Sequence, residues 1–277
     1  MGVPVGKVAA VHPIERLRYV ARADGAGPGS LAAEAAHALA GFADDPAALV
    51  TACRRLVDRH PTAGPLWSLA CRVLAATDPQ QEVWKMADEL ESDPTPLVLA
   101  DRLPGDATVV VLGWPELVGR ALGRRGDLRV LLVDTLGEGS SLARRLRSSG
   151  SEVLEVPESG LGSAVVDADL VVLEASVLSG RQLVSVAGAR AAASVARLAA
   201  RPVWVVAGTG RVVPARLGEA VWRRLDDDPD PPWDRDDEVV PVDLVDCVVG
   251  PSGAQAPAEA LRRMDCPVTP ELLRQVG

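Results

Sequence analysis

The sequence predicts an α/β fold in which an N-terminal helical domain precedes a mostly parallel β-sheet. Between about residues 107 and 250, short β-branched runs alternate with segments of helical periodicity, which is the βαβ pattern of a parallel sheet. These runs are almost continuously apolar, as expected of strands covered on both faces. The part before residue 96 has helical patterns only. We therefore expect a helical domain over residues 1–95 and an α/β domain over residues 96–277.

The helical domain is predicted to contain four helices separated by turn signals. Ser30 is expected to cap the first helix, which runs to Phe42, with Glu34 near the capping-box position. The segment Asp93-Pro94-Thr95-Pro96 indicates the domain boundary. The other three predicted helices are Ala47–Val57, Pro65–Ala75 and Pro79–Ser92.

The α/β domain is predicted to contain five strands and the helices between them. The acidic, proline-rich run 226–238 is expected to be a solvated loop. Residues 239–250 after it are expected to form either a closing strand or a short helix and a strand. The predicted strands are Ala107–Leu112, Arg129–Val133, Glu152–Val156, Leu170–Leu173 and Val203–Ala207. The predicted helices are Glu116–Gly123, Ser140–Ser149, Gly162–Val166, Gly188–Ala199, Ala256–Met264 and Thr269–Gln275.

Composition and charge exclude several classes of protein. The net charge of -9 argues against a nucleic-acid partner, which would require a basic surface. No run of about 20 apolar residues predicts a membrane span, and the start of the chain does not read as a signal peptide, so we expect a cytoplasmic protein. The four cysteines are far apart in sequence, which argues against a zinc site or a disulfide scaffold.

Two motifs that suggest a cofactor have simpler interpretations. Gly137 and Gly139 follow a strand and open a helix, as in half of a dinucleotide fingerprint, but Leu142 stands in place of its third glycine. We interpret them as a tight turn. The three histidines have no partners at metal-ligand spacing. We therefore predict neither a cofactor nor a metal.

The candidate ligand site is the edge of the sheet where the parallel strands end. Open α/β sheets bind ligands there, and a helix N-terminus beginning near Gly188 would offer N–H groups to an anion. Glu174 and Ser176 are the candidate catalytic side chains at this edge. A surface or helix-capping role is commoner for a residue such as Glu174, and the Ser176 hydroxyl is a poor acid or base near neutral pH. The predicted ligand-binding residues are Gly113, Trp114, Pro115, Asp134, Glu174, Ser176, Ser185 and Gly188.

An ordered set of motifs resembles the alpha, beta and delta subunits of eukaryotic initiation factor 2B and the related sugar-phosphate isomerases. The family's Arg-Pro-Thr-Ala-x-x-Leu is similar to residues 60–66, HPTAGPL, and its Thr-Pro-Pro-Glu-Leu-Val to residues 240–245, VPVDLV. The family's hallmark begins with a strand and a Gly-Ala-Asp or Gly-Ala-Glu motif, which are similar to residues 170–173 and 174–176. It continues with Asn-Lys-Ile-Gly-Thr and a strand that a proline precedes, which are similar to residues 185–189 and 201–204. The resemblance implies a Rossmann-like sheet, an N-terminal helical domain and a homodimer.

The chain departs from the isomerase pattern at the residues that carry chemistry. The resemblance implies a cysteine after the first strand and an aspartate opposite it, which together move a proton between adjacent carbons. Gly113-Trp114-Pro115 contains no thiol, and Ser176 stands at the aspartate position. Ser185 and Val186 replace the Asn-Lys pair, and Asp24 lies where the family has a phosphate-binding arginine.

These departures favour a non-catalytic member of the family that binds a small phosphorylated ligand or a protein partner. The first alternative is a sugar-phosphate isomerase that uses substituted residues, with Glu174 as the base. The second is a subunit of an exchange factor in translation. Negative charge from Asp134 and Glu174 is expected to weaken phosphate binding relative to the isomerases. A vestigial cleft filled by side chains is as compatible with the sequence as a working pocket.

Overall fold

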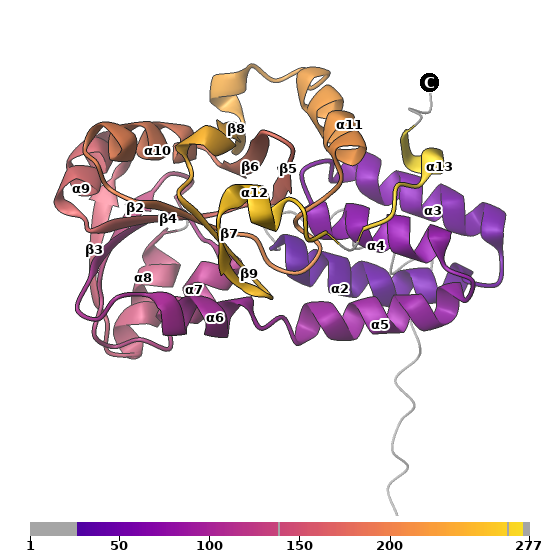
Figure 1. Ribbon diagram of the computed structural model, residues 1–277, viewed down its shortest axis with the longest axis horizontal. Helices are drawn as coiled ribbons and strands as arrows, with labels where there is room; N and C mark the ends of the chain where they lie inside the picture. The colour runs from indigo at the N-terminus through magenta and orange to yellow at the C-terminus, as the bar shows by residue number, and fades with distance from the viewer. Residues whose placement is uncertain (1–26, 138, 265, 274–277) are drawn as a thin grey trace, which may run out of the picture.

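The computed structural model describes residues 27–137, 139–264 and 266–273. Its first part is helical (Figure 1). A proline lies in the first turn of each long helix, where the absent N–H costs no hydrogen bond. Asp45 and Asp78 cap the second and fourth helices through their side chains. The elements are α2 (Pro28–Leu39), η1 (Ala40–Phe42), α3 (Pro46–Arg59), α4 (Gly64–Ala75) and α5 (Pro79–Glu91).

One sequence prediction for this region is wrong. Ser30 does not cap the first helix, because α2 begins two residues earlier and Gly27 is its N-cap. The segment predicted as the domain boundary is ordered: Asp93 accepts a hydrogen bond from the backbone N–H of Thr95, and a further helix, α6 (Thr95–Arg102), starts there. Pro96 therefore lies in the first turn of a helix, where a proline is tolerated.

The second part is an α/β sheet of seven strands in the order β10-β9-β7-β4-β1-β2-β3. All neighbouring pairs are parallel except β9 and β10, which form an antiparallel pair at one edge. This arrangement confirms the predicted fold class. The strands are β1 (Thr108–Leu112), β2 (Arg129–Asp134), β3 (Glu152–Pro157), β4 (Leu170–Glu174), β7 (Val203–Val206), β9 (Cys247–Gly250) and β10 (Gly253–Gln255).

Helices cover both faces of this sheet (Figure 1). One apolar cluster joins the sheet to α6, α7 and α8, and a second joins it to α9, α10 and α12. Because both faces are covered, the central strands have the continuous apolar character seen in the sequence. The bounds are α7 (Glu116–Leu122), α8 (Gly139–Ser148), η2 (Glu158–Gly160), α9 (Leu161–Asp167), α10 (Ala189–Leu198) and α12 (Pro257–Ala260).

A second sheet of three antiparallel strands lies beside the main one. Its order is β5-β6-β8, and β8 begins at Asp237. The acidic run is therefore only partly a loop, because its last two residues pair with β6. Arg235 holds the preceding turn by donating to three backbone oxygens, of Leu225, Asp228 and Asp230. The bounds are β5 (Val177–Ser179), β6 (Gln182–Val186), α11 (Ala215–Asp226), η3 (Pro232–Asp234), β8 (Asp237–Pro241), η4 (Val242–Leu244) and α13 (Pro270–Leu273).

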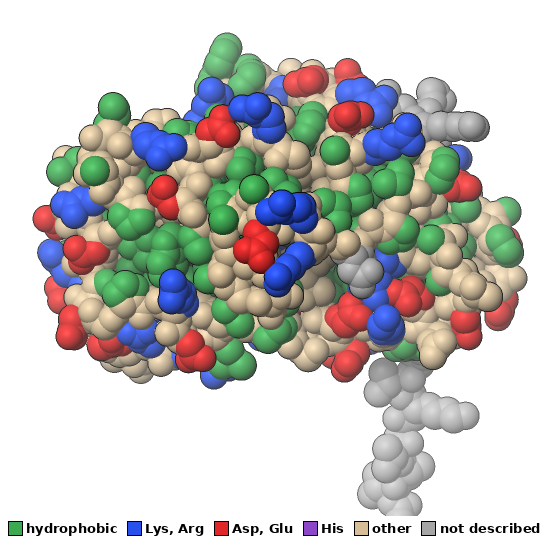
Figure 2. All heavy atoms as spheres, in the orientation of Figure 1, with side chains coloured by type: hydrophobic (Ala, Val, Ile, Leu, Met, Phe, Trp, Pro, Cys, Tyr) green, Lys and Arg blue, Asp and Glu red, His purple; other side chains and the backbone are tan. Residues whose placement is uncertain are grey.

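The helical part does not have a core of its own. Helices α2 to α5 share one apolar cluster with α11, α13 and residues of β5 and β6. On the face shown in Figure 2, acidic and basic side chains are interspersed. Within the described ranges, no helix is both long enough and apolar enough to span a membrane.

Candidate ligand-binding site

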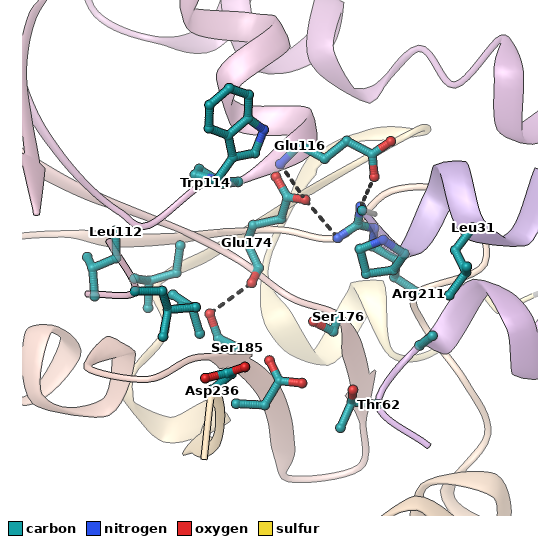
Figure 3. Close-up of a pocket in the computed structure, with 18 of the residues that line it drawn as sticks. Leu31, Thr62, Leu112, Trp114, Glu116, Glu174, Ser176, Ser185, Arg211 and Asp236 are labelled. Atoms are coloured by element: carbon teal, nitrogen blue, oxygen red, sulfur yellow. Dashed lines mark hydrogen bonds and ion pairs between the residues drawn. The ribbon is translucent and has the colours of Figure 1, made fainter. Parts of the chain in front are cut away.

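A cavity of about 600 Å³ lies at the carboxyl ends of β1 and β4, where the helical part meets the sheet. From β1 the chain continues to β2 and β3 on one side, whereas β4, β7 and β9 lie on the other. The cavity is therefore at the topological switch point, the usual ligand site of open α/β sheets. Its lining comes from the N-terminus of α2, the turn before α4, the ends of β1 and β4, β6, and the start of β8 (Figure 3).

Glu174, the last residue of β4, caps helix α7. Its carboxylate accepts hydrogen bonds from the backbone N–H groups of Glu116 (3.2 Å), Leu117 (2.8 Å) and Val118 (2.9 Å). These are donors without a partner inside the helix, and a carboxylate at a helix N-terminus also interacts favourably with the helix dipole. Burial raises the pKa of Glu174, although Arg211 and these N–H groups act in the opposite direction.

Arg211 is the cation of the site. Its side chain is only 2% exposed, and it follows the turn after β7. Nη1 lies 2.9 Å from Oε1 of Glu174 and donates to the backbone oxygen of Ala175, while Nη2 lies 3.4 Å from Oε2 of Glu116. A buried guanidinium needs such partners to offset its loss of hydration. Arg211 is thus already paired with two carboxylates.

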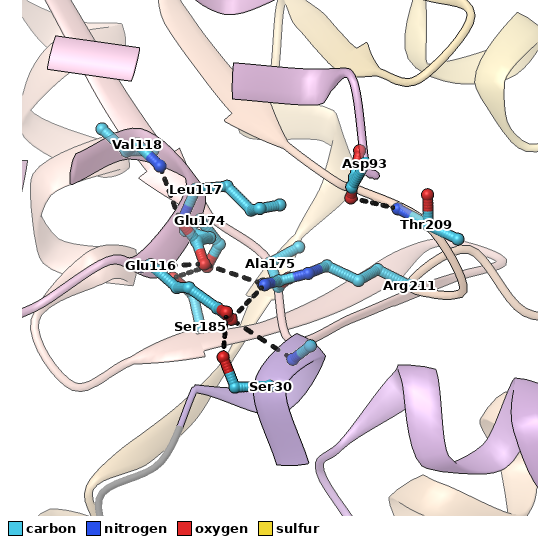
Figure 4. A network of polar contacts seen from close by, with 11 residues as sticks. Ser30, Asp93, Glu116, Leu117, Val118, Glu174, Ala175, Ser185, Thr209 and Arg211 are labelled. Atoms are coloured by element: carbon cyan, nitrogen blue, oxygen red, sulfur yellow. Dashed lines mark hydrogen bonds and ion pairs between the residues drawn. The ribbon is translucent and has the colours of Figure 1, made fainter. Parts of the chain in front are cut away.

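Glu116 extends this network to the helical part (Figure 4). Its carboxylate accepts hydrogen bonds from the backbone N–H of Gly29 (3.2 Å) and the hydroxyl of Ser30 (2.6 Å), both in the first turn of α2. A Cβ atom at Gly27 would meet the same carboxylate, so only glycine fits there without a shift. Two helix N-termini at the cavity are thus occupied by carboxylates of the chain itself.

The facing wall of the cavity includes hydroxyl groups, two further carboxylates and the imidazole of His60. Ser185 on β6 donates a hydrogen bond of 2.8 Å to the backbone oxygen of Glu174. Thr62, in the turn before α4, hydrogen-bonds the side chain of Asp237. Burial, together with the negative charge of Asp236, raises the pKa of Asp237 to about 6. This carboxyl group therefore titrates close to neutral pH.

The structure brings together five of the eight predicted site residues. Trp114, Pro115, Glu174, Ser176 and Ser185 line the cavity. The indole of Trp114 is 40% exposed at the rim, and the described residues leave the cavity open. The filled cleft considered above is therefore not what the described residues form.

The other three predicted residues lie outside the lining and have structural roles nearby. Gly113 and Gly188 have φ values of +61° and +90°, a region that favours glycine. A Cβ atom at Gly188 would lie 3.3 Å from the Thr135 side chain and 3.4 Å from that of Leu112. Asp134 accepts a hydrogen bond from the backbone N–H of Gly139 at the start of α8. Asp24 lies outside the described residues.

Sequence reasoning missed Arg211, Glu116 and the two aspartates that line the cavity. Arg211 directly follows the Gly-Thr-Gly turn at the carboxyl end of β7, and Glu116 is the first residue of the helix after β1. Position at a strand end was a usable signal for both. Asp236 and Asp237 gave no such signal, because they belong to an acidic run that reads as solvated.

Comparison with known proteins supports the fold. No protein-family model and no curated protein sequence matches the chain. Solved structures do match. The translation initiation factor eIF-2B of Pyrococcus horikoshii OT3 is 18% identical with a TM-score of 0.77, covering 91% of this chain and 99% of that one. The eIF2B beta of Chaetomium thermophilum is 18% identical with a TM-score of 0.69, covering 88% and 86%.

A further match is a chain of the tetrameric eIF2B-beta2-delta2 complex of C. thermophilum. It is 17% identical with a TM-score of 0.70, and the match covers 90% of this chain and 92% of that one. The similarity extends over the helical part and the sheet together, in agreement with the order of motifs in the sequence. The chain therefore has the fold of the eIF2B subunits, as the resemblance in its sequence predicts.

Proposed function

We propose that the chain is a non-catalytic member of the eIF2B alpha, beta and delta family that acts by binding, with its ligand site in the cavity at the ends of β1 and β4. One observation carries this proposal: the carboxylate of Glu174, the candidate base, already caps helix α7 and pairs with Arg211. Its side chain is 8% exposed, and its oxygens already interact with three N–H groups and Arg211. A general base needs a free lone pair within reach of the substrate.

The remaining groups support the same conclusion. Ser176 lines the cavity in place of an aspartate, and a hydroxyl is a poor acid or base near neutral pH. Trp114 and Pro115 occupy the place of the family's cysteine. The proton transfer that the isomerases perform thus lacks both of its partners.

A sugar-phosphate isomerase with substituted residues is the second candidate, favoured by one observation. Asp237 lines an open cavity and has a pKa of about 6, which suits a general base near neutral pH. Its carboxylate could replace the missing aspartate. The two candidates differ in whether a sugar phosphate is converted.

The finer expectations about ligand, assembly and location remain part of this proposal. A small phosphorylated ligand would find Arg211 already paired, so weak binding is expected. One of the similar structures is a tetramer of beta and delta subunits, which supports assembly of this chain with a second copy or a related chain. A cytoplasmic location is proposed from the sequence alone.

An activity assay with purified protein tests the proposal. Ribose 1,5-bisphosphate and methylthioribose 1-phosphate are incubated with the protein, and ketose products are measured. We expect no product above the protein-free control. Product formation that Asp237→Asn or Ser176→Ala abolishes would establish the isomerase instead.

A further inference from the structure

Two cysteines that are far apart in the sequence meet in the structure. Cys71 lies on α4, and Cys266 lies between α12 and α13. Cys266 packs against the apolar cluster that contains Cys71, and the two thiols are within hydrogen-bond distance of each other. Both thiols are free. The sequence separation that argues against a disulfide scaffold therefore does not keep these two sulfurs apart.

Other contacts also place Cys266 on this face of α4. Ser68, Cys71 and Arg72 are three and four residues apart, so their side chains lie on one face of the helix. The thiol of Cys266 is within hydrogen-bond reach of the Ser68 hydroxyl, and it lines a second cavity, of about 420 Å³, together with Ser68 and Arg72. Farther along the chain, the hydroxyl of Thr269 donates a hydrogen bond of 3.0 Å to the backbone oxygen of Cys71. The approach of the two sulfurs is therefore supported on both sides of Cys266.

The segment that carries Cys266, residues 266–273, is held to the helical part at its other end. Arg54 on α3 donates a hydrogen bond of 2.8 Å to the backbone oxygen of Glu271, and α13 lies against α3 (Figure 1). Cys266 itself belongs to neither a helix nor a strand. Its sulfur can therefore move the short way to an S–S bond length of about 2.0 Å without breaking a regular element.

The two thiols differ in accessibility and in acidity. Cys71 is fully buried, whereas Cys266 is partly exposed and lines the second cavity. The contact between them lowers the pKa of Cys71 and raises the pKa of Cys266. A small oxidant therefore reaches Cys266 first, and Cys71 is the thiol that more readily becomes a thiolate, the form that attacks sulfur.

We propose that Cys71 and Cys266 are a redox-active pair that closes to a disulfide and cross-links residues 266–273 to α4. Hydrogen peroxide is the oxidant. The sulfur of Cys266 attacks one peroxide oxygen, the O–O bond breaks, and water leaves with the thiol proton, so that Cys266 becomes a sulfenic acid. The Cys71 sulfur then attacks the Cys266 sulfur, the S–O bond breaks, and a second water leaves with the Cys71 proton. The two thiols are oxidised and the peroxide is reduced to water.

Such a pair is compatible with a reducing compartment. Disulfides of proteins in such compartments are usually transient and redox-sensing, because cellular thiols reduce them again. The inference does not depend on the proposed function, since neither cysteine lines the cavity at the ends of β1 and β4.

Peptide mass spectrometry tests the pairing. The full chain is treated with hydrogen peroxide near neutral pH, free thiols are blocked with N-ethylmaleimide, and the protein is digested with trypsin without reduction. Trypsin places Cys71 in residues 60–72, Cys266 in residues 264–274 and Cys53 in residues 23–54. We expect a cross-link between residues 60–72 and 264–274 that dithiothreitol breaks. A cross-link from Cys71 to Cys53, a disulfide between two chains, or no cross-link at all would overturn the proposal.

Thermal unfolding tests whether the bond holds the segment. Because the disulfide closes a long loop of the chain, oxidation should raise the Tm by about 5–10 °C, and dithiothreitol should reverse this rise. Cys266→Ala, at a partly exposed position, should retain the fold and abolish both the cross-link and the rise. Cys247→Ala is the matched control, because Cys247 is also partly buried but packs against a different apolar cluster, and oxidation should stabilise this variant as much as wild type. A rise that persists in Cys266→Ala, or a cross-link without any rise, would contradict the proposal.

Discussion

At position 211 a single guanidinium holds two carboxylates that come from different parts of the chain. Glu174 ends a central strand, while Glu116 begins the helix after the neighbouring strand and reaches the first turn of α2. Each carboxylate also satisfies helix N–H groups. The charges at this point therefore depend on one another, and removing one leaves the others buried without a partner.

Replacing Arg211 with methionine is expected to lower the free energy of unfolding by about 3 kcal/mol, because two carboxylates lose their counter-ion in a buried site. Urea unfolding measures the change. Arg181→Ala is the control: its partner is Asp243, both side chains are largely exposed, and the expected loss is below about 1 kcal/mol. Adding Glu174→Gln to the Arg211 variant should restore part of the stability. A loss equal to that of the control would contradict the buried network.

Asp237 gives a pH-dependent prediction. Its folded-state pKa of about 6 lies above the ordinary value of 3.8, so the native state binds more protons between these values. Stability from this group is therefore present at low pH and is lost as pH rises toward 6. The free energy of unfolding of Asp237→Asn, relative to that of wild type, should therefore increase by about 1–2 kcal/mol from pH 4 to pH 7. This figure is reduced to allow for the partial exposure of Asp237. Thermal unfolding at both pH values checks this, and a pH-independent difference would contradict it.

At the scale of elements, the helical periodicity and the short β-branched apolar runs in the sequence predicted most of the helices and strands. The first four helices and the five predicted strands lie within a few residues of their expected positions. The pattern failed for β5, β6 and α6. The two strands are short and joined by a tight turn at Gly180, so they leave little alternation to detect. Helix α6 starts in a segment with two prolines, which reads as a break.

The start of α10 illustrates a constraint at this scale. Gly188 adopts a φ of +90° as the N-cap, and a side chain there would press on Thr135 and Leu112. Gly188→Ala should therefore lower stability by about 1–3 kcal/mol. Gly162→Ala is the matched control, because it lies inside α9 with open space around its Cβ position, and it should raise stability by about 0.5–1 kcal/mol. Equal changes in chemical denaturation would contradict this account.

At the scale of the whole molecule, the order of motifs predicted the fold. The contacts that make up the site could not be predicted, because they join residues that are far apart in the sequence. Residues 60–63 form the turn that brings the helical part to the cavity, and Gly64, the first residue of α4, packs against backbone atoms of Ser176 and Arg211. This close approach explains why a glycine occupies position 64. The partners of Glu174 lie 37 and 58 residues away in the chain. Such distant contacts leave no local pattern in the sequence.

Assembly is also tested at this scale. The resemblance to initiation factor 2B subunits predicts a homodimer, with twofold symmetry as the default. Light scattering at micromolar concentration is expected to give about twice the chain mass of 28.9 kDa. A mass equal to one chain would contradict the prediction. A larger assembly would also refute the homodimer while retaining self-association.

The carboxylate of Glu116 at the N-terminus of α2 acts as a ligand that the chain supplies to itself. Through this contact the sheet side of the cavity is joined directly to the helical part. In hydrogen-exchange experiments, the backbone amide of Gly29 should be protected before any ligand is added. That protection should disappear in a Glu116→Ala variant.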